Sequence, residues 1–329
     1  MYRRQRFTLA AAVVALAATL PLHAAIDSPI RRTFQVREGG TLRLEASVGD
    51  VRIVTGNASS VTVEVQRSAK TSSRSKADEI FKDLEIAMSQ QGDDVIVKAK
   101  YDHPFTFFSW GNDLEVRYVV TVPPRYNADL STSGGDIRIA DLAGSINVKT
   151  SGGNIDVGRI GGAVTAHSSG GDIVLAAATG NVDVHTSGGG IRLGDIGGVA
   201  SVKTSGGSIA VRRAAGNLVA ATSGGGINID EALGAIDARS SGGSITARFA
   251  QQPRGDSRLA TSGGSVTVSF APNVAVEVDA HTSGGDVESD LPVTVLGRQS
   301  ESTLNGRING GGPRVVLRSS GGDIRLRRL

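Results

Sequence analysis

One short motif returns at a fixed interval in this sequence, and the interval limits the fold more than any other feature. Ser-Gly-Gly recurs every 18 residues from Ser133 to Ser241, then at Ser262 and Ser283, with a final copy at Ser320. Such spacing indicates repeated units that stack on one another, because a single unit cannot bury its own apolar side chains.

Apolar residues follow each motif at alternating positions. A first column begins two residues after the glycine pair, and a second column lies two positions further on. Spacing of two predicts a short strand with one buried face. Each unit has a second half, offset by nine residues, that opens on a glycine and carries two more apolar columns. The first column consists of Ile137, Ile155, Ile173, Ile191, Ile209, Ile227, Ile245, Val266, Val287 and Ile324.

These units predict an all-β protein, a single-stranded β-solenoid of the β-helix or β-roll kind with 18-residue coils. A propeller blade needs roughly 40 residues, more than one unit supplies. In a solenoid each coil lies about 4.8 Å above the last, so equivalent side chains stack into continuous columns. The glycines would form corners where a Cβ is obstructed or a positive φ is required. Two halves of nine residues favour a two-sided cross-section, with a three-sided one as the alternative.

We expect three regions along the chain: a signal peptide over residues 1–25, an N-terminal β-rich cap over residues 26–125, and the repetitive solenoid over residues 126–329. The first region begins with three arginines, continues with an apolar stretch, and ends on Ala24 and Ala25. This order is typical of a secretory signal peptide. The protein is therefore predicted to be exported, to the periplasm or to the cell surface and extracellular space, with no transmembrane segment in the mature chain.

Both ends of the solenoid are predicted to be capped, because an open edge strand would pair with another chain. In the N-terminal cap, Ile80, Phe81 and Leu84 have helical spacing, which predicts one amphipathic helix near residues 75–90. At the other end, the sequence RLRRL is predicted to give the last strand a charged edge.

Charge and composition exclude several classes of protein. Cleavage of the signal peptide removes three arginines and no acids, which lowers the formal net charge from +3 to zero. A neutral chain lacks the electrostatic attraction on which nucleic-acid binding depends. The absence of cysteine excludes disulfides, thiolate metal sites, cysteine nucleophiles and lipoprotein anchors. We therefore expect no nucleic-acid partner and no cofactor.

The glycine-rich stretch TSGGGIRLGDIGG resembles ligand-binding loops but lacks their spacing. Leu193 stands where a dinucleotide loop needs its third glycine, and Asp195 follows Gly194 where a phosphate-binding loop needs lysine. Calcium-binding rolls need aspartate at a fixed place in each repeat. Here the residue between the two apolar columns varies from coil to coil. Threonine precedes most of the motifs, which favours a hydrogen-bonded ladder at the corner over an ice-binding face.

A polysaccharide-cleaving enzyme needs clustered carboxylates or an activated nucleophile. The outward acids fall in two columns, and the repeat enforces no pair of them. His167 and His185 share a column in neighbouring coils, and His281 precedes a later motif, which favours a solvated ladder over a metal site. We therefore predict no catalytic residue, no metal and no enzymatic activity. The outward acids are Asp136, Asp141, Asp172, Asp195 and Glu231.

Two features outside the repeat are candidate contact sites. The stretch HPFTFFSW concentrates aromatic side chains, either as a plug over the first coil or as a loop that contacts a membrane or a partner. The inserted loop FAQQPRGDSRLAT contains Arg254, Gly255 and Asp256, the tripeptide that integrins recognise, with chance occurrence as the alternative. The aromatic residues are Phe105, Phe107, Phe108 and Trp110.

Three stretches carry a family resemblance over about residues 35–329. They are SVGDVRIVTGNASSVTVEVQRSA near the start, the SGGDI units in the middle, and LNGRINGGGPRVVLRSSGGDIRLRRL at the end. In these stretches the chain resembles the secreted bacterial "putative adhesin" domains of unknown function, a β-solenoid family. The resemblance implies a solenoid that is exported or faces the envelope, in some members linked to envelope stress, with no described catalytic residues.

The residues and the resemblance together predict a non-catalytic, exported β-solenoid that acts as an adhesin-like binding surface at the bacterial cell envelope. Its partner would be a glycan, a protein or another envelope component, held by weak contacts that repeat from coil to coil. One alternative is an envelope-stress sensor or assembly factor that contacts protein or lipid through the aromatic loop at residues 105–110. A polysaccharide-acting enzyme is the third alternative.

Overall fold

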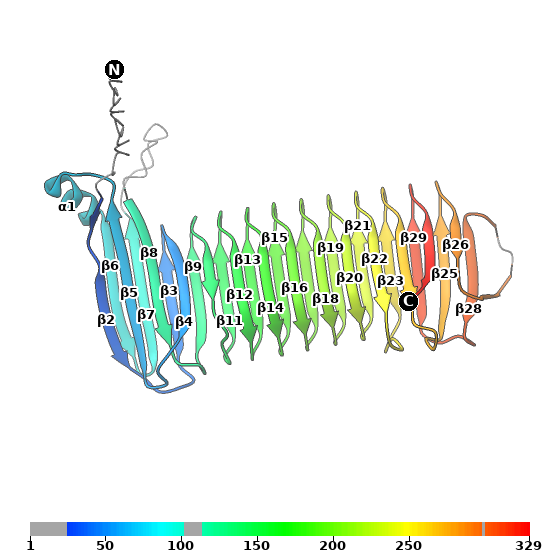
Figure 1. Cartoon of the computed structure of the whole chain (residues 1–329), viewed down its shortest axis with the longest axis horizontal. Helices are drawn as coiled ribbons and strands as arrows, with labels where there is room; N and C mark the ends of the chain where they lie inside the picture. The colour runs from blue at the N-terminus through cyan, green and yellow to red at the C-terminus, as the bar shows by residue number, and fades with distance from the viewer. Residues whose placement is uncertain (1–24, 102–113, 298–299) are drawn as a thin grey trace, which may run out of the picture.

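The computed structural model describes residues 25–101, 114–297 and 300–329, which form an elongated, nearly all-β rod (Figure 1). These residues contain 30 strands and one helix. Two sheets of 15 strands each run along the rod, and we call them sheet A and sheet B. The predicted β-solenoid is thereby confirmed, and its coils have two sides. Residues 1–24 of the predicted signal peptide lie outside the described residues.

Each regular coil contributes one strand to each sheet. Neighbouring strands pair in parallel with their equivalents 18 residues away, as Ile155 with Ile173 in sheet A and Val164 with Val182 in sheet B. The regular strands of sheet A are β10 (Ile137–Ile139), β12 (Ile155–Ile160), β14 (Ile173–Ala178), β16 (Ile191–Ile196), β18 (Ile209–Ala214), β20 (Ile227–Ala232), β22 (Ile245–Phe249) and β24 (Val266–Phe270). Those of sheet B are β9 (Asn127–Thr132), β11 (Ile146–Thr150), β13 (Val164–Ser168), β15 (Val182–Thr186), β17 (Ala200–Thr204), β19 (Leu218–Thr222), β21 (Ile236–Ser240) and β23 (Ser257–Thr261).

The predicted apolar columns form the core between the two sheets. Ile137, Ile155 and Ile173 are fully buried, and burial of one such side chain stabilises the fold by about 1.5–3 kcal/mol. Sheet A carries a further inward column that simple alternation does not predict. On each strand, two consecutive residues that do not point inward separate this column from the column before it. In β12 these two residues are Gly158 and Arg159. This column consists of Ile160, Ala178, Ile196, Ala214 and Ala232.

Close stacking, rather than a positive φ, explains the second glycine of each motif. A Cβ on Gly153 would collide with the backbone carbonyl oxygen of Gly135 in the neighbouring coil. The same collision recurs up the stack at Gly171, Gly189, Gly207, Gly225 and Gly243. Glycines with positive φ do occur in the described residues, but none lies between residues 127 and 270.

The threonine or serine before each motif points into the core and forms a hydroxyl ladder. Thr204 Oγ1 donates to the carbonyl oxygen of Gly189 at 2.8 Å and accepts from the N–H of Gly207 at 3.3 Å. Because these hydroxyls are buried, they cannot form an ice-binding face. The buried members in the regular coils are Thr132, Thr150, Ser168, Thr186, Thr204, Thr222, Ser240 and Thr261.

The parallel stack continues into the N-terminal region. Here β3 (Thr41–Ala46) and β4 (Asp50–Thr55) pair with β9 and β10, so that Val51 lies opposite Ile137. The next rung outward is formed by β7 (Asp94–Tyr101) and β8 (Leu114–Val122). The coil of β3 and β4 therefore lies between two later segments of the chain. The antiparallel strands that close this end are β1 (Ile26–Asp27), β2 (Ile30–Gln35), β5 (Ser60–Ala69) and β6 (Leu84–Gln91).

The predicted helix near residues 75–90 is too long. Helix α1 spans only Arg74–Lys82, with the side chain of Ser73 accepting from the N–H of Lys76 at its start. The prediction fails after residue 83 because Leu84, Ile86 and Met88 also fit a period of two. These residues belong to β6, which pairs antiparallel with β7 and covers the backbone groups at the edge of sheet B.

The C-terminal strands are not the outermost ones. The last rung is formed by β25 (Val276–Thr282) and β26 (Val287–Ser289). The inserted coil, β29 (Arg314–Ser319) and β30 (Ile324–Arg328), lies between this rung and the rung of β23 and β24. The antiparallel strands β28 (Thr303–Ile308) and β27 (Thr294–Val295) then extend sheet B beyond β25.

The prediction that RLRRL forms a charged last edge is therefore wrong. Ile324 in β30 pairs with Val266 on one side and with Val287 on the other. The inserted coil carries the same apolar column as its neighbours, so it continues the core at either position in the stack.

Candidate functional site

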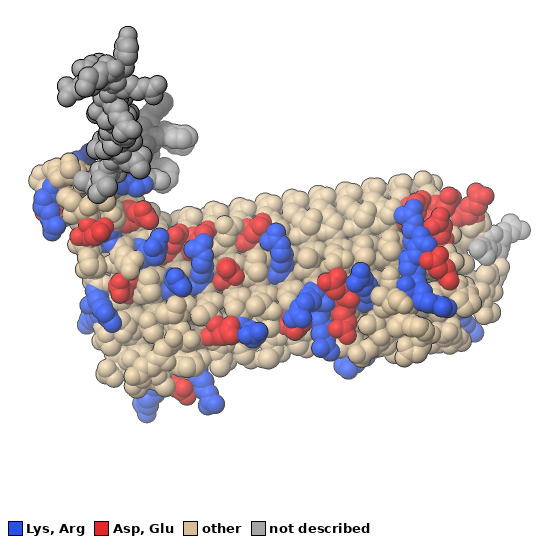
Figure 2. Space-filling view, in the orientation of Figure 1, with Lys and Arg blue, Asp and Glu red and all other residues tan. Residues whose placement is uncertain are grey.

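Charged side chains lie on the outside of the rod, where opposite charges are often paired. Figure 2 shows them in small groups, with uncharged surface between the groups. Ion pairs on exposed strands contribute only about 0–1 kcal/mol each. The pairs therefore set the electrostatic character of each face more than they stabilise the fold.

Each of the five outward acids considered for catalysis lies beside an arginine. Two carboxylates facing each other across a cleft are the arrangement that glycoside cleavage uses, whereas these acids form ion pairs along a sheet. The pairs are Arg138 with Asp136 at 2.8 Å, Arg159 with Asp141 at 3.4 Å, Arg192 with Asp172 at 3.5 Å, Arg212 with Asp195 at 2.5 Å, and Arg213 with Glu231 at 3.4 Å.

The structure brings two of the predicted histidines together. His167 and His185 are paired in register on β13 and β15, with ring centroids 6.1 Å apart. His281 lies on β25, where its Nδ1 is 3.1 Å from Thr303 Oγ1. Within the described residues, no group of three or more His, Cys, Asp or Glu side chains could hold a metal ion.

A shallow groove of about 560 Å³ runs along the outer face of sheet B, beside the Ser-Gly-Gly corners. We call it the sheet B groove. It is lined by one outward residue from each of six neighbouring strands and by the serines of the adjoining corners. The strand residues are His185, Lys203, Ala221, Arg239, Ala260 and Arg318. The corner serines are Ser205, Ser223, Ser241, Ser262 and Ser320.

Local strand geometry explains this lining. Side chains at the end of each strand point alternately out of and into the core. In β17, Lys203 points out, Thr204 points in, and Ser205 at the corner is exposed again. Parallel pairing then places Lys203 beside Ala221 and His185. The same pair of outward positions is thereby repeated about every 4.8 Å along the rod.

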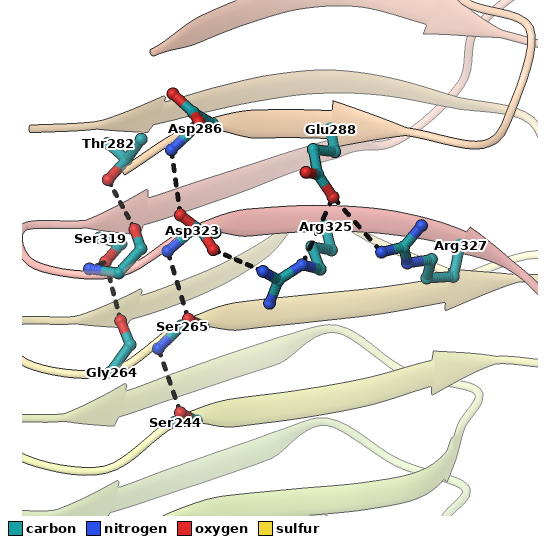
Figure 3. Close-up of polar contacts among 11 residues, drawn as sticks. Ser244, Gly264, Ser265, Thr282, Asp286, Glu288, Ser319, Asp323, Arg325 and Arg327 are labelled. Atoms are coloured by element: carbon teal, nitrogen blue, oxygen red, sulfur yellow. Dashed lines mark hydrogen bonds and ion pairs between the residues drawn. The ribbon is translucent and has the colours of Figure 1, made fainter. Parts of the chain in front are cut away.

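Hydrogen bonds between coils hold the corner next to the groove in place (Figure 3). The hydroxyl of Ser319 donates to Gly264 O at 2.8 Å, and the N–H of Asp323 donates to Ser265 Oγ at 3.2 Å. In the outermost rung, Asp286 N donates to Asp323 Oδ1 at 3.1 Å. These ladders link the inserted coil to both neighbours, so the groove wall is continuous across the change in chain order.

Basic side chains line the sheet B groove. Its lining contains Lys203, Arg239, Arg318 and His185 and no acidic residue. Arg239 is paired with Asp237 at 2.7 Å. Arg318 is paired with Asp279 at 2.9 Å, and hydrogen bonds from Arg318 are the main reason that the pKa of the Asp279 carboxyl is lowered.

A second hollow, of about 410 Å³, lies at the N-terminal end and contains both charges, among them Glu64, Arg67 and Arg117. Arg67 is engaged in packing: its guanidinium lies 4.9 Å from the Phe81 ring and donates to Ser28 O at 3.1 Å. Burial raises the pKa of the neighbouring Tyr118 hydroxyl. Arg67 therefore helps to hold α1 against β5.

The predicted contact residues lie apart from the groove or outside the described residues. Phe105, Phe107, Phe108 and Trp110 belong to the latter group. The tripeptide lies between β22 and β23, with the side chains of Arg254 and Asp256 exposed. Asp256 Oδ1 accepts from the N–H of Arg314 at 2.8 Å, so one carboxylate oxygen anchors β29. Integrin recognition stays a prediction.

Sequence reasoning missed most of the groove. Of the outward strand residues that line it, the sequence pattern singled out only His185, as a member of a histidine column. Steps of 18 from Lys203 lead to Ala221 and Arg239, and this arithmetic could have found them. Arg318 could not be found in this way, because it belongs to the inserted coil.

Comparison with known proteins places the chain in a family. A family model described as Toastrack DUF4097 matches residues 40–327. No curated protein matches the chain. No helix in the described residues is long and apolar enough to cross a membrane.

Several solved structures are similar over most of their length. A "putative lipid binding protein" from Parabacteroides distasonis is 13% identical, covers 90% of this chain and 96% of its own, and has a TM-score of 0.40. A "putative adhesin" from Parabacteroides merdae is 8% identical, with 92% and 96% covered and a TM-score of 0.37. Another, from Bacteroides fragilis, is 14% identical, with 92% and 97% covered and a TM-score of 0.33. Similarity this low transfers no ligand or function to this chain.

Proposed function

Since the chain belongs to the Toastrack DUF4097 family and presents the same outer positions coil after coil, we propose that it is a non-catalytic binding protein that adheres to a repetitive polymer at the bacterial cell envelope. The observation that carries the proposal is the sheet B groove, which is lined by side chains from the same outward position of six neighbouring strands. A polymer with a regular repeat could contact many coils at once. Weak contacts then sum through multivalency, without any deep pocket.

Retention on immobilised envelope polysaccharide tests this proposal. We expect the purified mature protein to be enriched on cell-wall or capsular polysaccharide relative to a bare matrix. The control for non-specific retention is a sample that has been unfolded and refolded and has not regained the native circular dichroism spectrum. Equal recovery of native and non-native protein, or no recovery at all, would refute polymer adhesion.

Export belongs to the same proposal. The order of basic, apolar and small residues in the first 25 positions supports cleavage after Ala24 or Ala25 and a location in the periplasm or at the cell surface. Mass spectrometry of the N-terminus from fractionated cells measures this directly. An intact Met1 in the cytoplasmic fraction would contradict it.

The aromatic loop offers a second candidate function, supported by its sequence alone. Four aromatic residues within six positions, in a chain with only 4% aromatics, favour contact with protein or lipid by an envelope-stress sensor or assembly factor. Replacing Phe107, Phe108 and Trp110 with serine is expected to abolish liposome or partner binding while polysaccharide retention persists. Unchanged liposome binding by the folded variant would remove this candidate.

A further inference from the structure

The sheet B groove is elongated along the rod, and its shape suits an extended ligand. Six strands, from β15 to β29 in the stack, cross the groove. The five intervals between them are about 4.8 Å each, which gives a path of about 24 Å. A shallow channel of this kind accommodates a linear chain rather than a compact small molecule, which needs a concave site that buries most of its surface.

The charges along this path favour an anionic ligand. Lys203 makes no ion pair within the described part of the chain, and no acid lines the groove. Arg239 contacts Asp237 through one nitrogen, which leaves other N–H donors of its guanidinium for a second anion. Asp183 and Asp237 belong to the neighbouring outward column of sheet B and flank the groove without lining it.

The spacing of the charges indicates how the anions should be arranged. Lys203 and Arg239 occupy one column two rungs apart, with Ala221 between them. Their backbone positions are therefore separated by about 10 Å along the rod. A polymer that carries one acid on every second sugar presents its charges at roughly such an interval, whereas a compact phosphate or a single sugar acid would reach only one of the two cations.

The uncharged lining favours a sugar chain over other polymers. A column of corner serines runs beside the column of cations, and serine hydroxyls can donate to and accept from sugar hydroxyls. The apolar lining is limited to alanine and the methyl groups of threonine, without the large anchors that peptide or lipid contacts use. The lining contains no Phe, Tyr or Trp on which nucleic-acid bases could stack.

Building on the proposed function, we propose that the sheet B groove binds a linear acidic polysaccharide. Lys203 and Arg239 contact successive carboxylates, and the corner serines, Ser205, Ser223 and Ser241, contact the hydroxyls of the sugars between them. The rigid hydrogen-bonded corner keeps these groups at a fixed spacing, so the ligand is recognised by the interval between its charges.

Binding of hyaluronan, in which one glucuronate alternates with one neutral sugar, tests the proposal against neutral dextran. The groove variant is Lys203→Ser with Arg239→Ser. The matched control is Arg192→Ser with Arg248→Ser, which removes the same charge from the exposed face of sheet A. We expect the mature protein to bind hyaluronan in preference to dextran, with affinity that falls as salt rises. The groove variant should bind about tenfold more weakly, as expected for two lost ionic contacts, and the control should bind as wild type does.

Circular dichroism establishes that both variants are folded. Equal binding to dextran, or equal loss in the groove variant and the control, would overturn the acidic-polysaccharide proposal while leaving adhesion to polysaccharide intact. Binding to phosphatidylglycerol vesicles without binding to hyaluronan would also overturn it, and would identify a lipid surface as the partner. Failure to retain any polysaccharide, envelope preparations included, would overturn the proposed function as well.

Discussion

The second glycine of each motif leaves no room for a side chain, because atoms of the neighbouring coil lie where its Cβ would be. Gly153 and Gly152 are adjacent and differ in this respect: a Cβ on Gly153 would meet the carbonyl of Gly135, whereas on Gly152 its nearest neighbour would be 3.6 Å away. We predict that Gly153→Ala destabilises the protein by about 1–3 kcal/mol, because backbone atoms must move.

The matched variant Gly152→Ala should change the free energy of unfolding by less than about 0.5 kcal/mol. Urea unfolding followed by circular dichroism measures both. Similar losses for the two variants would mean that glycine is needed at the corner for its conformation and not for the close approach of the coils.

The buried hydroxyls provide a second test at the level of single residues. Thr204→Val keeps the shape of the side chain but removes the bonds to Gly189 O and Gly207 N. Leaving such buried groups without a partner costs about 1–3 kcal/mol. The exposed neighbour gives the control, since Ser205→Ala should be almost neutral for stability. A neutral Thr204→Val, measured in the same way, would show that the ladder contributes nothing net.

Among the elements, the inserted coil of β29 and β30 holds the C-terminal end together. It supplies the parallel partners of β25 and β26, which otherwise face β23 and β24 across the space of one coil. Deletion of residues 314–329 should therefore increase amide hydrogen exchange across residues 276–308, while the coils from 137 to 232 stay protected.

Arg327→Ala with Arg328→Ala is the control for this deletion, because it removes charge and keeps the strand. Exchange in this variant should match wild type over residues 276–282. Unchanged protection after the deletion would show that β25 and β26 can close directly onto β23 and β24.

Asp279 on β25 gives the same end of the rod a dependence on pH. Its carboxylate contacts Arg314 at 2.5 Å and Arg318 at 2.9 Å, and hydrogen bonds to Arg318 lower its pKa despite partial burial. A lowered pKa in the folded state stabilises the fold above the ordinary aspartate value of about 3.9. This contribution is lost as the pH falls through the folded-state pKa.

Stability measured from about pH 6 to pH 2 should therefore fall less steeply for Asp279→Asn than for wild type. Glu277→Gln serves as the control, because Glu277 is more exposed and makes one longer pair, 3.6 Å to Arg307. Its profile should follow wild type. Parallel profiles for all three proteins would exclude Asp279 as a source of the acid sensitivity.

On the scale of the whole molecule, the coil is the unit that can be removed. Deletion of residues 187–204 joins Thr186 to Ser205 and preserves the Thr-Ser-Gly-Gly corner. We predict a folded rod that is shorter by about 4.8 Å, since each coil contacts only its neighbours. Deletion of nine residues, 187–195, should prevent normal folding because every later strand would enter the opposite sheet.

Small-angle scattering and thermal unfolding compare the two deletions. A folded nine-residue variant with an unbroken rod would contradict the assignment of half-coils to separate sheets. Failure of the 18-residue variant alone would mean that particular coils, and not only their number, are needed for the fold.

The two ends of the rod share a design that concerns the molecule as a whole. In each case the outermost parallel rung comes from an internal segment, β7 with β8 or β25 with β26, and a coil nearer the chain terminus lies inside it. Antiparallel strands then cover part of each end. Peeling away an outer rung therefore requires the inner coil to lose its pairing as well, which protects edges that would otherwise pair with other chains.

Much of the fold could be predicted from the repeat. The 18-residue interval and the alternation at Ile191 and Leu193 define strands, an inward face and parallel stacking in register. The last inward column of sheet A was missed, since Ile160 breaks strict alternation. The helix was overextended because Leu84 and Met88 fit two periods, and only pairing with β7 decides between them.

Local periodicity was sufficient to predict the coil, its two halves and the buried columns. The tertiary structure alone decided the order of the rungs at both ends, and with it the position of Arg318 in the groove. Periodicity does not distinguish the two orders, because Ile324 and Val287 occupy the same apolar column and either residue matches Val266. Two contacts beyond the repeat fit the observed order: β28 pairs antiparallel with the outer edge of β25, and the N–H of Arg314 in the inserted coil donates to Asp256 beside β23.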